Sequence, residues 1–351
     1  MDRFVCVRLV QANALDLTLF QFDYDLTFAV FFMNADRTIY GRYGSRSDRR
    51  DATRDVSIDG FRQALLAALD LHKRYPANRA SLAGKQPKPT RFKVPDEYPF
   101  LHGRYQPKLD YEGKVVQSCM HCHQVRESER RLFRNEKGPI PDDVLFPYPM
   151  PDTVGLSLDP KEAARVKNVA AGSAAERAGF QTGDRILGLD GQPILSIADV
   201  QWVLHNAGAP AAIKAQVGRG QGRKALELRL APDWRHGSDI AWRVSSWDLR
   251  RMAAGGLLLE DATADERRKA KLSENDLALR VNHVGEYGEH ELAKKAGFKK
   301  DDILVSVAGQ AKRMTESQLL GYLLRNKMPG EKIAVTVLRS GERLDLELPM
   351  Q

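Results

Sequence analysis

Two cysteines and a histidine lie within five residues of one another, in the segment Cys119-Met120-His121-Cys122-His123. The chain has one further cysteine, Cys6, and three cysteines in 351 residues are too few for a disulfide scaffold. Thiolates bind zinc and exchange disulfides, and imidazole binds transition metals. This spacing therefore indicates a site for a metal or for redox chemistry.

The same segment resembles the Cys-x-x-Cys-His attachment motif of c-type cytochromes. The resemblance implies one covalent haem c, with Cys119 and Cys122 as thioether anchors and His123 as axial ligand of the iron. It also implies electron transfer or redox sensing. Met150, in the proline-rich segment 146–151, is the expected second ligand, and His102 is the alternative.

Two other interpretations of the cysteine pair stay open. In one, Cys119 and Cys122 bind a structural zinc together with one or two of His102, His121 and His123. In the other they form a redox dithiol at the start of a helix, because a helix N-terminus lowers the pKa of a thiol. The second interpretation places a strand at residues 114–117 and a helix at residues 124–135.

An internal repeat organises the C-terminal part of the chain. Residues 178–192 align without a gap with residues 296–310, at an offset of 118. Each copy is followed by a predicted helix and two predicted strands: 197–206, 212–217 and 225–230 in the first copy, and 316–326, 332–338 and 343–348 in the second.

The first copy resembles the PDZ signature of bacterial envelope proteins. The resemblance is carried by Gly172–Phe180, by Gly183–Leu187 and by the turn Asp190-Gly191. The second copy departs from it, with Asp301 at the turn glycine and Ala308 at the Asn/Asp position. The resemblance implies two PDZ-like β-sandwich modules, at residues 152–232 and 251–351, joined by a tryptophan-rich connector at residues 233–250.

PDZ domains bind protein C-termini or other extended peptides as an added strand beside a helix, and a glycine-containing loop holds the carboxylate. The resemblance therefore implies two sets of peptide-binding residues. The loops are Val154, Gly155, Leu156 and Ser157 in the first copy, and Gly255, Gly256, Leu257 and Leu258 in the second. The helix residues are Val200, Val203 and Leu204, and Leu319, Tyr322 and Leu323, although an apolar helix stripe is often only core.

The first 75 residues predict the order β-α-β-β-α. The strands are expected at residues 4–10, 28–33 and 38–44, with a short helix at 16–20 and a longer one after the cap Ser57. This order is similar to the C-terminal two-thirds of a thioredoxin-like domain, but the Cys-x-x-Cys helix and the cis-proline of that family are absent. We therefore expect a scaffold or docking role, with Cys6 as a buried core thiol.

Composition narrows the functional classes. The net charge of +8 is spread along the chain, which favours a solvated surface over nucleic-acid binding. No apolar run is long enough for a transmembrane helix. No Gly-x-Ser-Gly-Gly stretch or other nucleophile-base-acid set is evident, so the chain is not expected to be a protease or another hydrolase, although a protease or redox partner stays open.

Together these features predict an α+β multidomain protein, and the resemblance implies a location in the bacterial periplasm or cell envelope. No signal peptide precedes residue 4, and we expect the start of the chain to be trimmed. The segments are a partial thioredoxin-like domain (1–75), a proline-rich Cys-x-x-Cys-His segment (76–151) and the two PDZ-like modules. The predicted function is peptide binding combined with haem redox chemistry. The alternatives are a non-redox scaffold with structural zinc and a thiol oxidoreductase.

Overall fold

The computed structural model describes residues 3–162 and 164–351. The chain forms two compact units, each built from two stretches of sequence. The first unit contains the residues up to Glu129 together with Tyr148–Trp234, and the second contains Arg130–Pro147 together with Arg235–Gln351. No helix among the described residues is long and apolar enough to cross a membrane.

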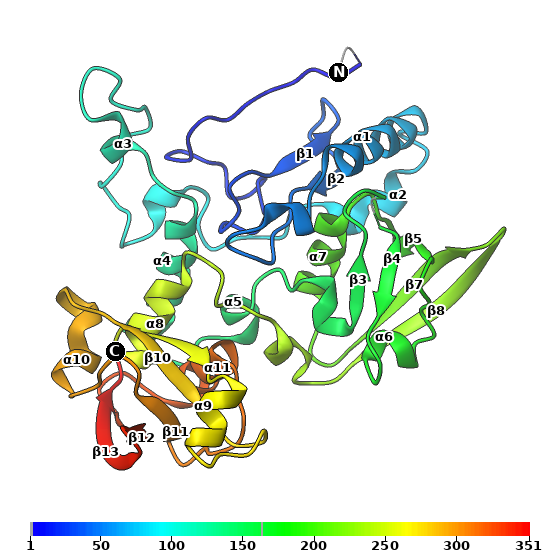
Figure 1. The fold of residues 1–351 in the computed structure, drawn as a ribbon. Coiled ribbons are helices and arrows are strands. Elements are labelled where there is room, and N and C mark those ends of the chain that lie inside the picture. The colour runs from blue at the N-terminus through cyan, green and yellow to red at the C-terminus, as the bar shows by residue number, and fades with distance from the viewer. Residues whose placement is uncertain (1–2, 163) are drawn as a thin grey trace. The chain divides into compact units, whose positions relative to one another are not determined.

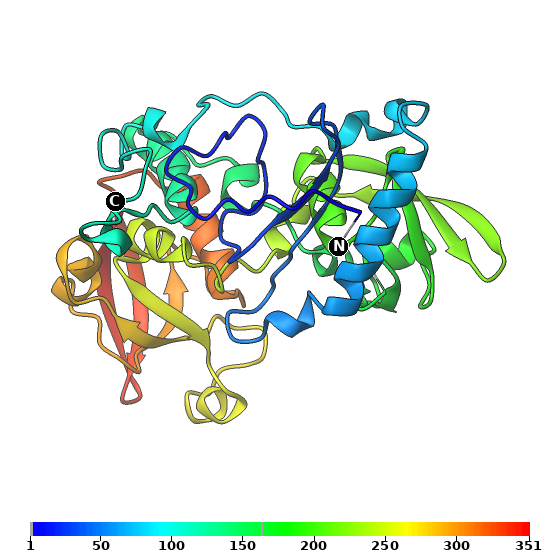
Figure 2. The ribbon, with the colours of Figure 1, turned by 90° about the horizontal axis from the view of Figure 1, so that it is seen from above.

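The N-terminal part of the first unit has one long helix and one small sheet. Residues 3–29 run as loops and turns (Figures 1 and 2). Two antiparallel strands follow, and α1 packs against the second of them. The elements up to the repeat are β1 (Val30–Met33), β2 (Ile39–Tyr43), η1 (Ala52–Arg54), α1 (Ile58–Lys73), α2 (Arg79–Leu82), η2 (Ala83–Lys85), η3 (Pro95–Glu97), α3 (Val115–Ser118) and α4 (His123–Asn135).

Helix α1 begins where the sequence predicts it. The Ser57 side chain accepts a hydrogen bond from the Gly60 N–H, which satisfies one of the free donors at the helix start. Ala64, Ala68 and Leu71 recur at helical spacing and are buried against the sheet. The 197–206 and 316–326 helices are also confirmed, as α7 and α11.

Several expectations for the N-terminal stretch are wrong. Residues 4–10 form no strand, Val5 and Val7 are exposed, and the thiol of Cys6 is exposed rather than buried. A strand needs a neighbour for its backbone groups, and no described strand pairs with this segment. Residues 16–20 form turns rather than a helix, because the Asp16 carboxylate accepts hydrogen bonds from the N–H and hydroxyl of Thr18.

The thioredoxin-like expectation is not supported. Among the described residues 3–75 there are two strands and one α-helix, so the predicted order of five elements is incomplete. The strand expected at residues 114–117 is also wrong, because α3 covers Val115–Ser118. Helix α4, in contrast, is confirmed one residue longer than predicted.

The first module completes the first unit. Its strands form a pair, β3-β4, and a four-stranded sheet in the order β6-β5-β7-β8. Helix α7 closes the apolar core between them. The elements are η4 (Pro151–Val154), β3 (Leu156–Leu158), β4 (Val166–Val169), α6 (Ala174–Arg177), β5 (Arg185–Leu189), β6 (Gln192–Pro193), α7 (Ile197–Asn206), β7 (Ala211–Arg219) and β8 (Gly222–Leu230).

The second module repeats this plan in the second unit, with one five-stranded antiparallel sheet in the order β13-β12-β11-β10-β9. Part of the expected tryptophan-rich connector is helical, as η5 and α8. The elements of this unit are the end of α4, then α5 (Asp142–Leu145), η5 (Trp234–Gly237), α8 (Ser246–Ala254), β9 (Leu257–Asp261), α9 (Ala264–Lys269), β10 (Leu279–Val284), η6 (Gly288–Glu291), α10 (Leu292–Lys295), β11 (Ile303–Val307), α11 (Glu316–Asn326), β12 (Lys332–Arg339) and β13 (Glu342–Pro349).

Each module contains an arginine paired with a buried aspartate at the same place in the repeat, which confirms the repeat at the level of side chains. In the first module Arg219 binds both carboxylate oxygens of Asp184, at 2.7 and 2.8 Å, and also the Gly179 carbonyl. In the second module Arg339 makes the equivalent bonds to Asp302 and Gly297. Such a bidentate pair fixes the turn that opens the central strand.

Candidate peptide-binding site

Strand β3 and helix α7 form the two walls of the site that the first repeat predicts. Leu156 and Leu158 of the strand belong to the same apolar cluster as Ile197 and Leu204 of the helix. The helix begins at Ile197 because the Ser196 side chain accepts a hydrogen bond from the Ala198 N–H. The residues that would line a peptide groove are therefore brought together.

The backbone of β3 offers the N–H of Leu158 on the side of the helix. The Asp159 N–H donates to the Arg165 carbonyl, across the side of β3 that faces β4. Because N–H groups alternate sides along a strand, the N–H of Leu158 points the other way, towards α7. Leu158 lies opposite Val166, whose own N–H donates to the Asp184 carbonyl, so these two residues exchange no hydrogen bond. Within residues 3–162 and 164–351, no loop or side-chain bond satisfies the Leu158 N–H either. A peptide carbonyl could accept it.

The predicted loop residues lie at the end of η4 and the start of β3, and the amide of Gly155 is turned inward. Gly155 has φ +92°, and a Cβ there would come within 2.1 Å of the Ser173 Cβ, so only glycine fits. Its N–H donates to the Asp152 carbonyl at 2.9 Å, which closes the short helix η4. This amide is therefore not free to hold a carboxylate in the conformation described.

The side chains predicted for the first site are almost all buried. Val154, Leu156, Val200, Val203 and Leu204 are at most 3% exposed, and Ser157 is exposed. The sequence could not separate groove from core here, because both use the same apolar stripe. It also missed Ile197, which starts the helix and is buried beside β3 in the same cluster.

A buried ion pair holds the side of α7 that faces away from β3. Lys85 Nζ lies 2.9 Å from Asp199 Oδ2, and both side chains are 1% exposed. The Asp199 carboxylate also accepts the N–H groups of Arg42 and Leu195. Burial lowers the pKa of Lys85, although the charge of Asp199 opposes the shift. This pair fixes the helix against β2 and η2.

Two further segments cover α7 at its ends. At its N-terminal end, Ser196 and Ile197 border a small cavity of about 10 Å³ with Tyr43, Ser45 and Pro160. At its C-terminal end, the rings of Tyr148 and His205 stack at 4.1 Å. The Gln201 side chain donates to the Tyr148 carbonyl at 3.0 Å. Both ends of α7 are thus covered by segments of the same unit.

In the loop predicted for the second module, the backbone N–H groups of the two glycines also donate within the chain. The N–H groups of Gly255 and Gly256 are directed at the Arg250 carbonyl, which ends helix α8. Leu257, Leu319 and Leu323 are buried, whereas Leu258 and Tyr322 are partly exposed. These residues form core more than an open groove.

The Cys-x-x-Cys-His segment lies at the start of α4, which begins at His123. Cys119 and Cys122 are free thiols and are partly buried. Burial, with a smaller effect of Cys119, raises the pKa of Cys122. Burial alone would lower the pKa of His123, but the hydrogen bond and charge of Glu127 raise it.

The histidine fits a ligand role better than the rest of the segment does. His123 Nδ1 lies 2.9 Å from Glu127 Oε1, which leaves Nε2 for a metal, and such a carboxylate partner is typical of metal-bound imidazoles. Met150 packs against the core of the first module. His102 is exposed and pairs with Asp96. Neither is placed as a second ligand by a described contact.

The zinc alternative lacks a complete ligand set. In the described part of the chain, no three His, Cys, Asp or Glu side chains gather as a metal site would require. The rings of His121 and His123 stack at 5.5 Å, so these two imidazoles are neighbours.

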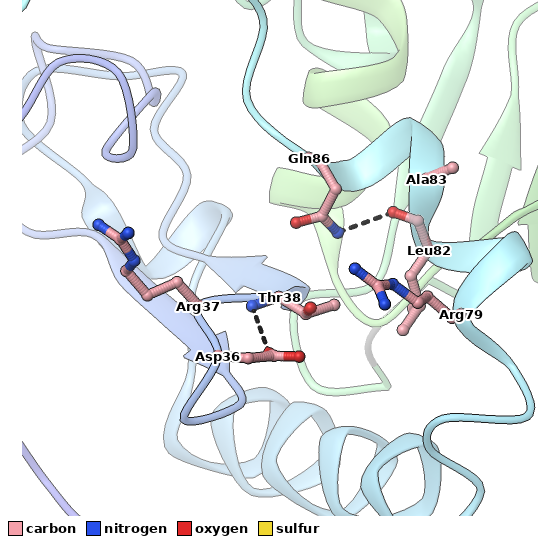
Figure 3. Close-up of a pocket in the computed structure, with 7 residues that line it drawn as sticks. All are labelled: Asp36, Arg37, Thr38, Arg79, Leu82, Ala83 and Gln86. Atoms are coloured by element: carbon pink, nitrogen blue, oxygen red, sulfur yellow. Dashed lines mark hydrogen bonds between the residues drawn. The ribbon is translucent and has the colours of Figure 1, made fainter.

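A larger cavity, of about 340 Å³, lies in the first unit away from the predicted residues. Figure 3 shows Arg79 beside Gln86 and Leu82, with the Arg37 side chain directed away from it. The Gln86 amide is already bonded to the backbone of Ile39 and Leu82. No sequence motif points to this cavity, and its polar wall joins η2 to β2.

Comparison with known proteins identifies the first module. Residues 165–216, from the start of β4 into β7, match the PDZ domain family. HhoA of Synechocystis sp., which its name assigns to the serine proteases, is 39% identical over 66 residues. That match covers 19% of this chain and 17% of HhoA.

Solved structures of the HtrA-type protease AlgW also match, one with a decapeptide and one with a tripeptide. Each is 15% identical and covers 40% of this chain, with 44% and 50% of the AlgW chains covered. The TM-scores are 0.25 and 0.24, too low to support an argument from the fold as a whole. The chain thus spans half or less of the length of these proteins.

Proposed function

We propose that the PDZ domain of the first module binds extended peptides, with a free C-terminus, along β3. The observation that carries the proposal is the N–H of Leu158, which faces α7 with no acceptor among the described residues, between apolar side chains of both walls. A peptide added as a strand would supply the missing acceptor and bury its own apolar side chains there.

Binding in this mode requires movement of the loop at Gly155 and of the segment at Tyr148. Gly155 must release its N–H from Asp152 before the loop can hold a carboxylate, and the segment at Tyr148 must yield at the C-terminal end of α7. A substantial minority of protein complexes show loop rearrangements of this kind on binding. We therefore expect slow association rather than weak final affinity.

Titration of the full chain with a library of C-terminal peptides tests the proposal. We expect saturable binding by peptides that end in apolar residues. Gly155→Ala is the matched variant, because it strains the loop without changing any apolar wall, and we expect it to lose binding at temperatures where it is still folded. An absence of binding by the wild-type chain at millimolar peptide would contradict the proposal.

A second proposed function is redox chemistry at a covalent haem. The orientation of His123 by Glu127 supports it, because the bond to Nδ1 leaves Nε2 available as an axial ligand. Cys119 and Cys122 would anchor the porphyrin through thioether bonds, and the iron would supply one-electron transfer. The position of Met150 against the module core does not support it as the second ligand.

The haem proposal is tested by colour. Protein made with a cytochrome maturation system should give a pyridine haemochrome spectrum, and Cys119→Ala should reduce the covalent haem content. Met150→Leu is the matched variant for the second ligand and should leave the content unchanged. Colourless wild-type protein would contradict the proposal. Metal analysis and a thiol count on the same sample test the zinc and dithiol alternatives.

Haem attachment by this motif and PDZ domains of this type both favour a cell-envelope location, which we propose for this chain. HhoA is a serine protease by name, but these 351 residues contain no Gly-x-Ser-Gly-Gly stretch. We therefore propose peptide recognition, and not peptide cleavage, as the activity of this chain. A protease partner is part of this proposal and would be found by co-purification.

A further inference from the structure

A buried carboxylate joins three elements of the second module. Glu316, the first residue of α11, accepts two hydrogen bonds from Arg250 of α8, at 2.8 Å to Oε1 and 2.6 Å to Oε2. Its Oε1 also accepts the N–H of Leu259 in β9, at 2.9 Å. Both charged side chains are at most 5% exposed. The carboxylate thus satisfies a strand N–H from within the chain.

The N–H of Leu259 is the counterpart of the N–H that the first module leaves without an acceptor. Leu259 pairs with Val281, as Leu158 pairs with Val166, and each pair follows an irregularity in the strand register. Val281 donates to the Asp302 carbonyl, as Val166 donates to that of Asp184. The two leucines therefore occupy the same position in the repeat.

The helix residue that faces this position differs between the modules. Ser196 caps α7 and Thr315 caps α11, so the first helical residues, Ile197 and Glu316, correspond. An alkyl side chain cannot accept a hydrogen bond, whereas a carboxylate can. The first module consequently offers its strand N–H to a ligand, and the second does not.

Helix α8 reinforces the closure of the second module. It packs against both α11 and β9, the two walls of the predicted groove, and eight of its nine residues are buried. Arg250 also donates to the Ala241 carbonyl at 2.9 Å, which fixes its guanidinium. Arg250 and Glu316 thus join α8 to α11, so removal of this ion pair should free both the strand N–H and the helix that covers it.

We infer that Glu316 decides which of the two modules accepts a peptide, by acting as the resident ligand of the second module's strand edge. The inference rests on the proposed function of the first module. It predicts that each chain binds one peptide, at the first module, and that the second module binds none. Replacing a charge-assisted hydrogen bond with that of a neutral peptide carbonyl should weaken binding there by about 10- to 100-fold.

The test is the number of peptides bound per chain by Arg250→Met/Glu316→Ile. The double variant copies the isoleucine of the first module and removes both charges, because removal of one alone would leave a buried charge unpaired. The probe is an octapeptide that ends in Leu-Val-Phe with a free C-terminus. Titration calorimetry on the full chain measures the number of peptides bound. Lys332→Met/Glu347→Ile, which removes an exposed pair of the same module, is the control.

We expect one equivalent for the wild type and for the control, and two for the double variant. Two equivalents for the wild type would overturn the inference while supporting the proposed function. No binding by the wild type with one equivalent for the double variant would contradict the proposed function alone. One equivalent for a folded double variant would overturn the inference.

Amide hydrogen exchange decides the case in which no peptide binds or the double variant does not fold. In the wild type, the Leu259 amide should exchange at least tenfold more slowly than the Leu158 amide. Glu316→Gln, which keeps an acceptor but loses the charge, should narrow that difference. Equal exchange of the two amides in the wild type would overturn the inference.

Discussion

Removing the carboxylate of Asp199 should detach the outer side of α7. In Asp199→Ala, Lys85 is left as a buried ammonium group without its partner at 2.9 Å, and the N–H groups of Arg42 and Leu195 lose their acceptor. This helix is one wall of the proposed peptide-binding site, and β3 is the other. The substitution therefore tests how the site is held as well as how the unit is stabilised.

The magnitude follows from the burial of the pair. Breaking a buried ion pair by removing one partner costs about 3–5 kcal/mol. Each backbone N–H left without an acceptor adds roughly 1–3 kcal/mol, although these effects overlap. Because Lys85 already has a lowered pKa, it can lose its proton, which limits the total. We expect a loss of about 4 kcal/mol in the free energy of unfolding.

Urea unfolding, followed by tryptophan fluorescence, measures this loss. Trp202 donates to the Gly84 carbonyl, so its signal reports on the same joint. The control is Asp70→Ala, which breaks an exposed pair with Arg74 and should cost no more than about 0.5 kcal/mol. Lys85→Met/Asp199→Asn should lose less than the sum of its single variants. A loss below about 1 kcal/mol for Asp199→Ala would refute the reasoning.

Three further outcomes are expected. Burial lowers the pKa of Lys85 below 10.5, so between the lowered pKa and pH 10.5 the unfolded chain binds more protons than the folded chain. The free energy of unfolding should therefore rise with pH across that interval, and unfolding of Lys85→Met as a function of pH should show a smaller rise. Burial alone would raise the pKa of Asp184, but its hydrogen bonds to Arg219 and the Gln181 N–H lower the pKa below 3.8. The free energy of unfolding should therefore fall as the pH drops below 3.8, and Asp184→Asn should show a smaller fall over the same acidic range. Gly155→Ala should lower the free energy of unfolding by roughly 2 kcal/mol, because the residue has φ +92° and no room for a Cβ, whereas Gly220→Ala, also at positive φ but with open space around it, should cost less.

The repeat was the part of the fold that the sequence predicted best. The helices predicted after each copy have the bounds of α7 and α11, and in the structure Ser196 and Thr315 cap them, because local capping decides where such helices begin. The N-terminal stretch failed for the opposite reason. The apolar segment from Val5 to Val10 has the composition of a strand, but a strand forms only where a neighbour accepts its hydrogen bonds.

The site was only half predictable for the same physical reason. Gly155 and Gly256 are marked by residue type as places where the backbone can take a positive φ, and both do. The acceptors that their amides use are not marked in the sequence. The bond from Leu259 to Glu316 joins residues 57 positions apart, so only the folded chain reveals that the second edge is already occupied.

The central claim is that a peptide adds to β3, and the most direct measurement is hydrogen exchange at the Leu158 amide of the full chain with and without saturating peptide. Strand addition predicts that exchange at this amide slows by at least tenfold on binding, while the amide of Leu259 does not change. Saturable binding that leaves the Leu158 amide unprotected would place the peptide elsewhere and would contradict the account.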